Sequence, residues 1–305
     1  MKTVKINLQK LVSSRYGVGL AITLSQALPP WLGYRIGDLA ARIIVGNKRS
    51  EMGRAVRANQ WMISAETLNG PALEKRTHQV FRINTHCLYD YYHNLKRPQV
   101  VRDMVSFDPN FKDVLTQVET GHSPALFLMP HLSNYDLAGR ALALYGLNFQ
   151  VLSYPQPPSG YQLANQIRQE GGMEVTPMSI QAVQQARQRL RAGGVVLTGV
   201  DRPLGDTRYF PRFFGKPAHL PVAHVQLALQ VDVPVYVVAC VQIGPARYKI
   251  VASPRLIMQH LADRVTTLIQ NAETILAEVE KLVRAYPTQW AMFYPVWPEA
   301  LARFA

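Results

Sequence analysis

The sequence predicts an α/β fold with a mostly parallel central sheet flanked by helices. Two observations carry this prediction. Short apolar runs, long enough for buried strands, alternate in the middle of the chain with segments of helical periodicity. The 305 residues are also 48% hydrophobic and 17% charged, a composition typical of globular proteins. Such alternation is typical of parallel sheets that helices cover on both faces.

The individual elements follow from local patterns. The expected strands are apolar runs at residues 125–129, 149–153, 174–176, 195–200, 233–241 and 248–251. The expected helices have apolar residues at three- and four-residue spacing and cover residues 35–45, 72–95, 134–146, 160–170, 179–192 and 261–285. The helix expected at 179–192 ends at Gly193-Gly194, a normal helix stop.

The N-terminal region is strongly basic. Residues 1–58 hold ten Lys and Arg residues against two acidic residues, so +8 of the net charge of +13 lies there. Positive charge mixed with large apolar residues suits an anionic membrane surface better than a nucleic-acid groove, although a solvated helix face has the same pattern. We therefore expect membrane-docking helices at 1–58 and an α/β domain at 59–305, in one structural unit, with no nucleic-acid partner.

Residues 16–34 carry no formal charge, which makes them a candidate membrane span. Polar residues and the pair Pro29-Pro30 interrupt this segment, whereas a spanning helix needs about 20 mostly apolar residues. An interfacial helix that turns at the prolines is the favoured interpretation. Cys87 and Cys240 are isolated in the sequence, which indicates a reduced compartment without a structural disulfide or zinc site. No cleavable signal peptide is expected.

Titratable residues follow two of the expected core strands. His131 comes after strand 125–129, and Asp201 comes after strand 195–200. In open α/β sheets, ligands bind beyond the carboxyl ends of the strands. This rule predicts a site at His131 and Asp201 before any motif is considered.

Residues 130–136 join a strand to a helix and carry a histidine and a carboxylate. Histidine suits the role of general base because its ordinary pKa is about 6.5. A carboxylate such as Asp136 can orient the imidazole, and backbone N–H groups at the helix start could hold an oxyanion. The structural alternative is a capping box formed by Ser133 and Asp136, with His131 as a buried core histidine.

These residues resemble a known family. His-x-x-x-x-Asp after an apolar strand is similar to the lysophospholipid acyltransferase superfamily, and residues 130–139 resemble its lipid A acyltransferase branch. Within that branch the chain is most similar to the phosphatidylinositol mannoside acyltransferases. The resemblance covers roughly residues 30–297 and continues through residues 165–168, 194–202, 213–217, 234–235 and 286–290.

The resemblance implies an O-acyltransferase that forms no covalent enzyme intermediate. Acyl-CoA or acyl carrier protein would donate the acyl group as a co-substrate, and a hydroxyl of a membrane glycolipid or phospholipid would accept it. It implies no cofactor or metal, and a peripheral location on the cytoplasmic face of the cell membrane. We also expect a hydrophobic acyl tunnel that opens near His131.

The resemblance also implies roles for individual residues. His131 is the implied general base, Asp136 its partner and Asp201 a third catalytic residue. Arg168 could neutralise a phosphate. The residues implied to bind substrate are Arg168, Ser133, Asn134 and Arg202.

Two departures from the superfamily pattern narrow the expectations. The Glu-Gly-Thr-Arg motif of the glycerophosphate acyltransferases is absent, and residues 199–202 read Gly-Val-Asp-Arg instead. This difference favours a glycolipid acceptor over a simple glycerophosphate. Many lipid A enzymes carry Glu where Asp136 stands.

Several alternatives stay open. Ser123 partly mimics the nucleophile elbow of an α/β-hydrolase-type esterase, but it precedes its strand rather than following it. His86, Asp90 and His93 share one helix face, which fits either a metal site or an ordinary polar surface. A non-catalytic peripheral lipid-binding protein would share the basic N-terminal region but would not need a histidine and carboxylates at strand ends.

Overall fold

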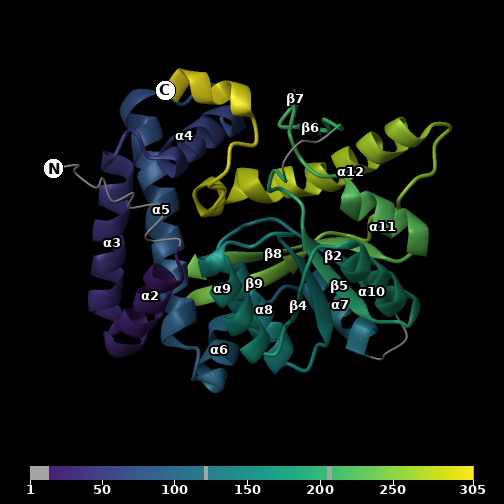
Figure 1. Ribbon diagram of the computed structural model, residues 1–305, viewed down its shortest axis with the longest axis horizontal. Coiled ribbons are helices and arrows are strands. Elements are labelled where there is room, and N and C mark those ends of the chain that lie inside the picture. Colours follow the sequence, from purple (N-terminus) through teal and green to yellow (C-terminus); the bar gives the residue numbers. More distant parts are fainter. Residues whose placement is uncertain (1–13, 120–122, 205–207, 305) are drawn as a thin grey trace.

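A computed structural model describes residues 14–119, 123–204 and 208–304 of the chain. Its centre is a seven-stranded sheet in the order β1-β9-β8-β2-β5-β3-β4 (Figure 1). β8 and β9 pair antiparallel, and all other neighbours in this sheet pair parallel. The strands are β1 (Val105–Phe107), β2 (Ala125–Met129), β3 (Phe149–Ser153), β4 (Glu174–Pro177), β5 (Val195–Gly199), β8 (Val235–Gly244) and β9 (Arg247–Ala252). The predicted fold class is confirmed.

Helices cover both faces of the sheet. They are α2 (Arg15–Ala27), α3 (Pro30–Gly46), α4 (Glu51–Ile63), α5 (Gly70–His93), α6 (Pro98–Met104), α7 (Pro109–Glu119), α8 (Tyr135–Leu144), α9 (Ser159–Glu170), α10 (Ile180–Arg191), α11 (Ala223–Val231) and α12 (Arg264–Ala285). The 3-10 helices η1 (Pro287–Gln289) and η2 (Pro298–Phe304) and a small hairpin, β6 (Arg212–Phe213) with β7 (Lys216–Pro217), complete the chain.

Alternate side chains of the central strand β2 divide the interior into two cores. Leu126 and Leu128 pack with residues of α4, α10, α11 and α12. Phe127 and Met129 point the other way, because strand side chains alternate, and pack with residues of α5 to α9. Burial on both faces explains why β2 reads as a continuous apolar run.

All six predicted strands and all six predicted helices are present, and each strand starts within two residues of the expected position. The pattern gave no bounds for α4, within the helical N-terminal region, and it did not predict β1, β6, β7, α6, α7 or α11. In α4 the reason is visible, because Arg57, Asn59 and Gln60 are buried polar residues that mask the apolar periodicity.

The chain turns at the prolines as expected. α2 ends at Ala27 and α3 begins at Pro30, a position where proline is pre-organised for a helix. α3 packs closely on α5, since a Cβ on Gly33 would lie 2.0 Å from a ring carbon of Tyr89. In the part of the chain that the structure describes, no helix combines the length and the apolar character needed to cross a membrane.

The polar face of α5 holds the N-terminal helices in place. Tyr89 donates to the Leu28 carbonyl over 2.8 Å, and His93 lies 2.6 Å from the Ser25 carbonyl. His86 lies 2.8 Å from Asp38 of α3. Within the described ranges no cluster of His, Cys, Asp and Glu is suited to a metal ion. The hydrogen bonds of His86 and His93 to the N-terminal helices give these residues of the polar face a structural role without a metal ion.

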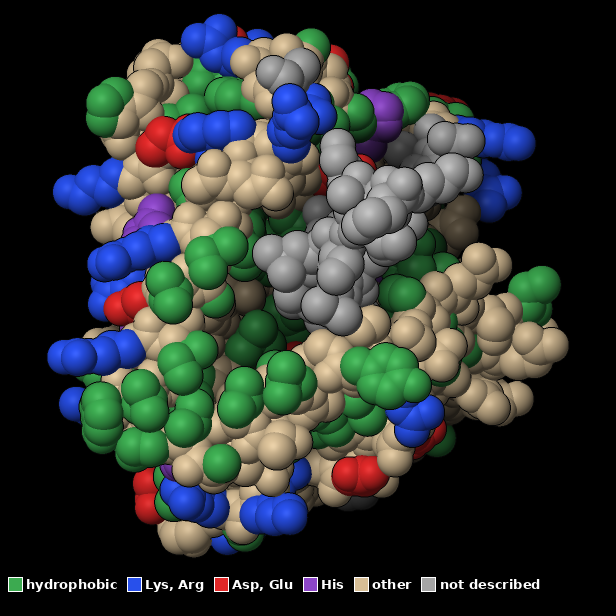
Figure 2. Space-filling model, turned by 60° about the vertical axis from the view of Figure 1, so that its left-hand side comes forward, with side chains coloured by type: hydrophobic (Ala, Val, Ile, Leu, Met, Phe, Trp, Pro, Cys, Tyr) green, Lys and Arg blue, Asp and Glu red, His purple; other side chains and the backbone are tan. Residues whose placement is uncertain are grey.

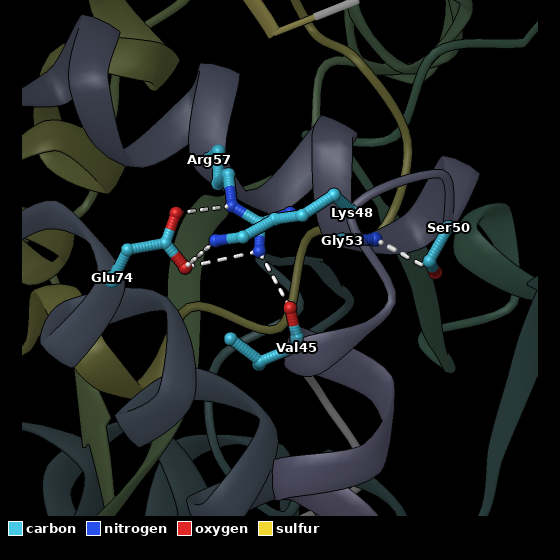
Figure 3. Close-up of polar contacts among 6 residues, drawn as sticks. All are labelled: Val45, Lys48, Ser50, Gly53, Arg57 and Glu74. Carbon is cyan, nitrogen blue, oxygen red and sulfur yellow. Dashed lines mark hydrogen bonds and ion pairs between the residues drawn. The ribbon is translucent and has the colours of Figure 1, made fainter. Parts of the chain in front are cut away.

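Two of the ten basic residues in the N-terminal region are engaged in an ion-pair cluster around Glu74 (Figure 3). Arg57 lies in α4 with its side chain 4% exposed and donates to both Glu74 oxygens, at 2.8 and 3.0 Å. Lys48 approaches Glu74 at 2.8 Å. Residue 58, the predicted boundary, therefore lies inside a helix that is packed into the molecule.

Candidate active site

The pairing of two strands brings His131 and Asp201 together. β2 and β5 run parallel, with Ala125 opposite Val195 and Met129 opposite Gly199. His131 and Asp201 each come two residues after the last paired residue of their strand. They therefore lie side by side at the same edge of the sheet. Their side chains meet, with His131 Nδ1 2.7 Å from Asp201 Oδ1.

This contact sets the chemistry of the imidazole. Asp201 is fully buried, and it also accepts a hydrogen bond from the His131 backbone N–H over 2.9 Å. A carboxylate oxygen accepts hydrogen bonds, so the contact fits the tautomer in which Nδ1 donates and Nε2 is left as the acceptor nitrogen. The His131 side chain is 21% exposed, which leaves the ring accessible from the cavity beside it.

A third residue completes this arrangement. The indole Nε1 of Trp290 donates to Asp201 Oδ2 over 2.7 Å. The extended segment around Trp290 is also hydrogen-bonded to the turn that carries His131. The Ser133 N–H donates to the Gln289 carbonyl over 2.8 Å, and the Ala291 N–H donates to the His131 carbonyl over 2.9 Å. Sequence reasoning did not single out Trp290 as a site residue, although it belongs to the closing segment 286–290 that carried the family resemblance.

Asp136 has a different partner from the one expected. Both of its oxygens accept from Arg168 of α9, over 2.7 Å from Nε and 3.1 Å from Nη2. The carboxylate that contacts the imidazole is thus Asp201, and the expected His131–Asp136 contact is replaced by an Asp136–Arg168 ion pair. Burial on its own would lower the pKa of Arg168, but Asp136 and Tyr161 together raise it above its ordinary value.

Ser133 and Asn134 shape the turn between β2 and α8. Ser133 has a left-handed backbone with φ of 51°. Asn134 caps α8 by accepting from Leu137 N at 3.3 Å, and its amide donates to the Cys87 carbonyl at 2.8 Å. The N-cap is therefore Asn134 and not Ser133, so the capping-box alternative is replaced by a simpler cap. Both side chains are buried and lie outside the cavity wall.

A cavity of about 80 Å³ opens beside His131. Its polar residues are His131, Asp136, Ser153, Tyr161 and Arg168. The rest of its wall is mainly apolar and consists of Met129, Pro130, Tyr135, Gly139, Phe149, Val151, Leu152, Met173, Leu197 and Gly199. A Cβ on Gly139 would lie 2.6 Å from Met173 Sδ, so glycine keeps room for this methionine in the wall. The cavity therefore lies between α8 and the strands β3 and β5.

Two further predicted residues, Arg202 and Ser123, lie at different distances from this site along the chain. Arg202 directly follows Asp201, and its guanidinium lies over the rings of Tyr294 and Tyr154 at 4.0 and 4.5 Å. Ser123 precedes β2, so it lies at the opposite end of that strand from His131. The nucleophile-elbow alternative therefore gains no support from the arrangement of the site.

A buried carboxylate, a histidine in contact with it and an adjoining apolar cavity form a candidate acid–base site at the strand ends of an α/β sheet. Residues 106–299 match the model of the bacterial lipid A biosynthesis acyltransferase family, and the chain belongs to this family. The predicted family resemblance is confirmed.

Two curated relatives carry the same description. They are the proteins called phosphatidylinositol mannoside acyltransferase in Mycobacterium tuberculosis strains H37Rv and CDC 1551. Each is 29% identical to this chain in an alignment 185 residues long that covers 57% of this chain and 54% of the relative. The chain thus spans about half the length of the curated relatives it matches.

Proposed function

We propose that this protein transfers an acyl group from a thioester, acyl-CoA or acyl carrier protein, to a hydroxyl of a membrane glycolipid or phospholipid. The observation that carries the proposal is the 2.7 Å contact that holds His131 Nδ1 against buried Asp201 at the mouth of an apolar cavity. The family and the name of its mycobacterial relatives support acyl transfer to a lipid. The missing glycerophosphate motif favours a glycolipid as acceptor.

The proposed reaction uses His131 as base and then as acid. Nε2 takes the proton of the acceptor hydroxyl while its oxygen attacks the thioester carbonyl. As the C–O bond forms and the C–S bond breaks, the imidazolium returns the proton to the leaving thiolate. Asp201 stabilises the imidazolium, and a base of this kind contributes about 100- to 10,000-fold to the rate.

The start of α8 supplies donors for the transient oxyanion. The N–H groups of Leu137 and Ala138 are used by Asn134, through its side chain and its carbonyl. Those of Tyr135 and Asp136, two residues of the cavity wall, remain for the oxygen. Preorganised backbone donors at such a position stabilise the charge that develops in the transition state.

We further infer that the N-terminal helices dock on the cytoplasmic face of the cell membrane as a peripheral anchor. Figure 2 shows apolar side chains gathered on the face that carries α2 and α3. The exposed large apolar residues of these two helices are Tyr16, Leu20, Leu24, Trp31, Ile36, Leu39 and Ile43. Arg15, Arg35 and Arg42 are interspersed among them, the mixture expected of an interfacial helix on an anionic surface.

Replacement of the base tests the proposed reaction. His131→Ala should lower transfer from labelled acyl-CoA to extracted membrane glycolipids by at least about 100-fold, because it removes the proton acceptor. The exposed His260 offers a matched control, and His260→Ala should keep wild-type turnover. Circular dichroism would show that both variants fold. Wild-type turnover in folded His131→Ala would contradict the mechanism, whereas an absence of transfer by the wild-type protein would favour a lipid-binding role.

A further inference from the structure

Arg202 stands out among the charged residues around the site because its charge is not neutralised by any carboxylate that the structure describes. The nearest candidate in the sequence, Asp201, uses its oxygens for His131 and Trp290. Asp136 binds Arg168 through both oxygens. The ion pairs of the described ranges leave Arg202 out.

Aromatic rings surround this guanidinium instead. Its central carbon lies 4.0 Å from the ring centre of Tyr294, 4.5 Å from that of Tyr154 and 5.7 Å from that of Tyr161. The faces of aromatic rings attract a cation but accept little from its N–H donors, which lie in the guanidinium plane. One of these donors, Nε, is buried and has no hydrogen-bond partner. The rings therefore hold the group without using its N–H donors. Because Nε is buried, a ligand would approach the two terminal amino groups of the guanidinium.

Tyr161 links this group to the cavity wall. Tyr161 is part of the cavity wall, and Arg168 lies over the same ring at 5.0 Å. Two arginines thus contact the ring of Tyr161. Arg168 forms an ion pair with Asp136, whereas Arg202 has no ion-pair partner among the described residues. A planar fork with unused donors suits bidentate binding of a phosphate, and loss of hydration on the ring faces strengthens that attraction.

We propose that Arg202 binds a phosphate group of a substrate beside the cavity, next to Tyr161, the role that the family resemblance implied for Arg168. This inference rests on the proposed acyl transfer. The phosphate has two sources. It belongs either to the phosphopantetheine arm that CoA and acyl carrier protein share, or to the phosphodiester of the acceptor lipid.

The test compares substrates that differ in a phosphate. Wild type, Arg202→Gln and Arg202→Lys are assayed with acyl-4′-phosphopantetheine against acyl-pantetheine, which lacks only the phosphate, and with a phospholipid acceptor against a phosphate-free alkyl mannoside. Arg202→Gln should raise KM for one phosphate-bearing substrate about 10- to 100-fold, with little change in kcat or in KM for its phosphate-free counterpart. The pair that responds identifies the source. Arg202→Lys should recover part of the loss, because it keeps the charge but not the planar fork.

Two controls separate binding from folding. Arg191→Gln removes an exposed arginine at the end of α10 and should change none of these values. Tyr294→Leu keeps Arg202 but removes its nearest ring, and it should raise the same KM by a smaller factor, even if Arg202→Gln does not fold. A fall in kcat with every substrate pair would assign Arg202 to oxyanion stabilisation or packing and overturn the proposal.

Calorimetric titration with inorganic phosphate needs no turnover and separates this proposal from the proposed function. Wild type and Arg191→Gln should bind phosphate equally, and Arg202→Gln should bind it at least tenfold more weakly. If phosphate binding depends on Arg202 but the wild-type protein has no transferase activity, the phosphate site is supported and the proposed function is rejected. If the wild-type protein has transferase activity but Arg202→Gln binds phosphate normally, the proposed function stands and the phosphate site is rejected.

Discussion

At the scale of single residues, the two aspartates near His131 have different partners. Asp201 contacts the imidazole and Asp136 contacts Arg168. The sequence pointed to both carboxylates, because one follows a core strand and the other completes the His-x-x-x-x-Asp motif. It could not pair them, since the Asp136 contact depends on how α8 packs against α9 and the Asp201 contact depends on strand register.

These partners predict different losses for two matched substitutions. Asp201→Asn keeps the shape of the side chain but removes the charge that stabilises the imidazolium in the proposed mechanism, so kcat should fall by about 10³- to 10⁴-fold. Asp136→Asn should affect kcat less but should lower the free energy of unfolding by about 3–5 kcal/mol, because Arg168 is left buried without a counter-charge.

Steady-state kinetics and urea denaturation of the same two proteins measure both quantities. The expected order is a larger kinetic loss for Asp201→Asn and a larger loss of stability for Asp136→Asn. If Asp136→Asn instead showed the larger fall in kcat with wild-type stability, Asp136 would be the residue that supports the base.

At the scale of elements, the helices that expose apolar side chains are those that the charge pattern predicted for membrane contact. α2 and α3 have few buried residues, namely Gly33, Ala41 and Val45 of α3. By contrast α4, which was assigned to the same region, buries nine of its 13 residues. Composition could not separate these helices, because arginines on a surface and arginines in an ion-pair cluster contribute equally to net charge.

The docking face predicts a defect in membrane binding. Trp31 is 63% exposed and Leu39 57% exposed, so replacing both by Ser should remove apolar area without opening the core. Each side chain contributes about 1.5–3 kcal/mol when it is buried in an apolar phase, so the double variant should bind anionic vesicles at least about tenfold more weakly in a sedimentation assay.

Replacing an exposed apolar residue by Ser on another face of the molecule serves as the control. Ile180 of α10 is 77% exposed, and Ile180→Ser should bind vesicles like wild type. Both proteins should acylate a detergent-soluble acceptor at the wild-type rate. Unchanged vesicle binding by the double variant would place the docking face elsewhere.

At the scale of the whole molecule, the end of the chain returns to its first third. η2 lies beside α4 (Figure 1). Asn59 of α4 donates to the carbonyls of Met292 and Tyr294 over 3.0 and 2.8 Å and accepts from Val296 N over 3.1 Å. The sequence predicted the sheet, whose apolar runs are local signals. It did not predict this closure, because a buried asparagine has no periodic signature and its partners lie more than 230 residues away.

Asn59 therefore predicts a loss of stability that extends to the site. Asn59→Ala leaves three backbone groups without their partner and should lower the free energy of unfolding by about 2–4 kcal/mol, as measured by urea denaturation. Activity should also fall, because Trp290 belongs to the segment that Asn59 anchors. Asn148 is exposed, so Asn148→Ala should change neither quantity. Equal stability of the two variants would show that this closure is dispensable.

The alignment of β2 with β5 has a consequence for how such a site can change over evolution or in design. His131 and Asp201 each stand two residues past a matched pair of strand residues. Inserting or deleting one residue in either short extension would turn one side chain toward the opposite side of the sheet. α/β enzymes commonly diversify by lengthening their loops. Insertions at these two positions would separate His131 from Asp201 and are therefore not tolerated. New substrate preferences have to arise from the helices and turns around the cavity, while the spacing of the pair stays constant.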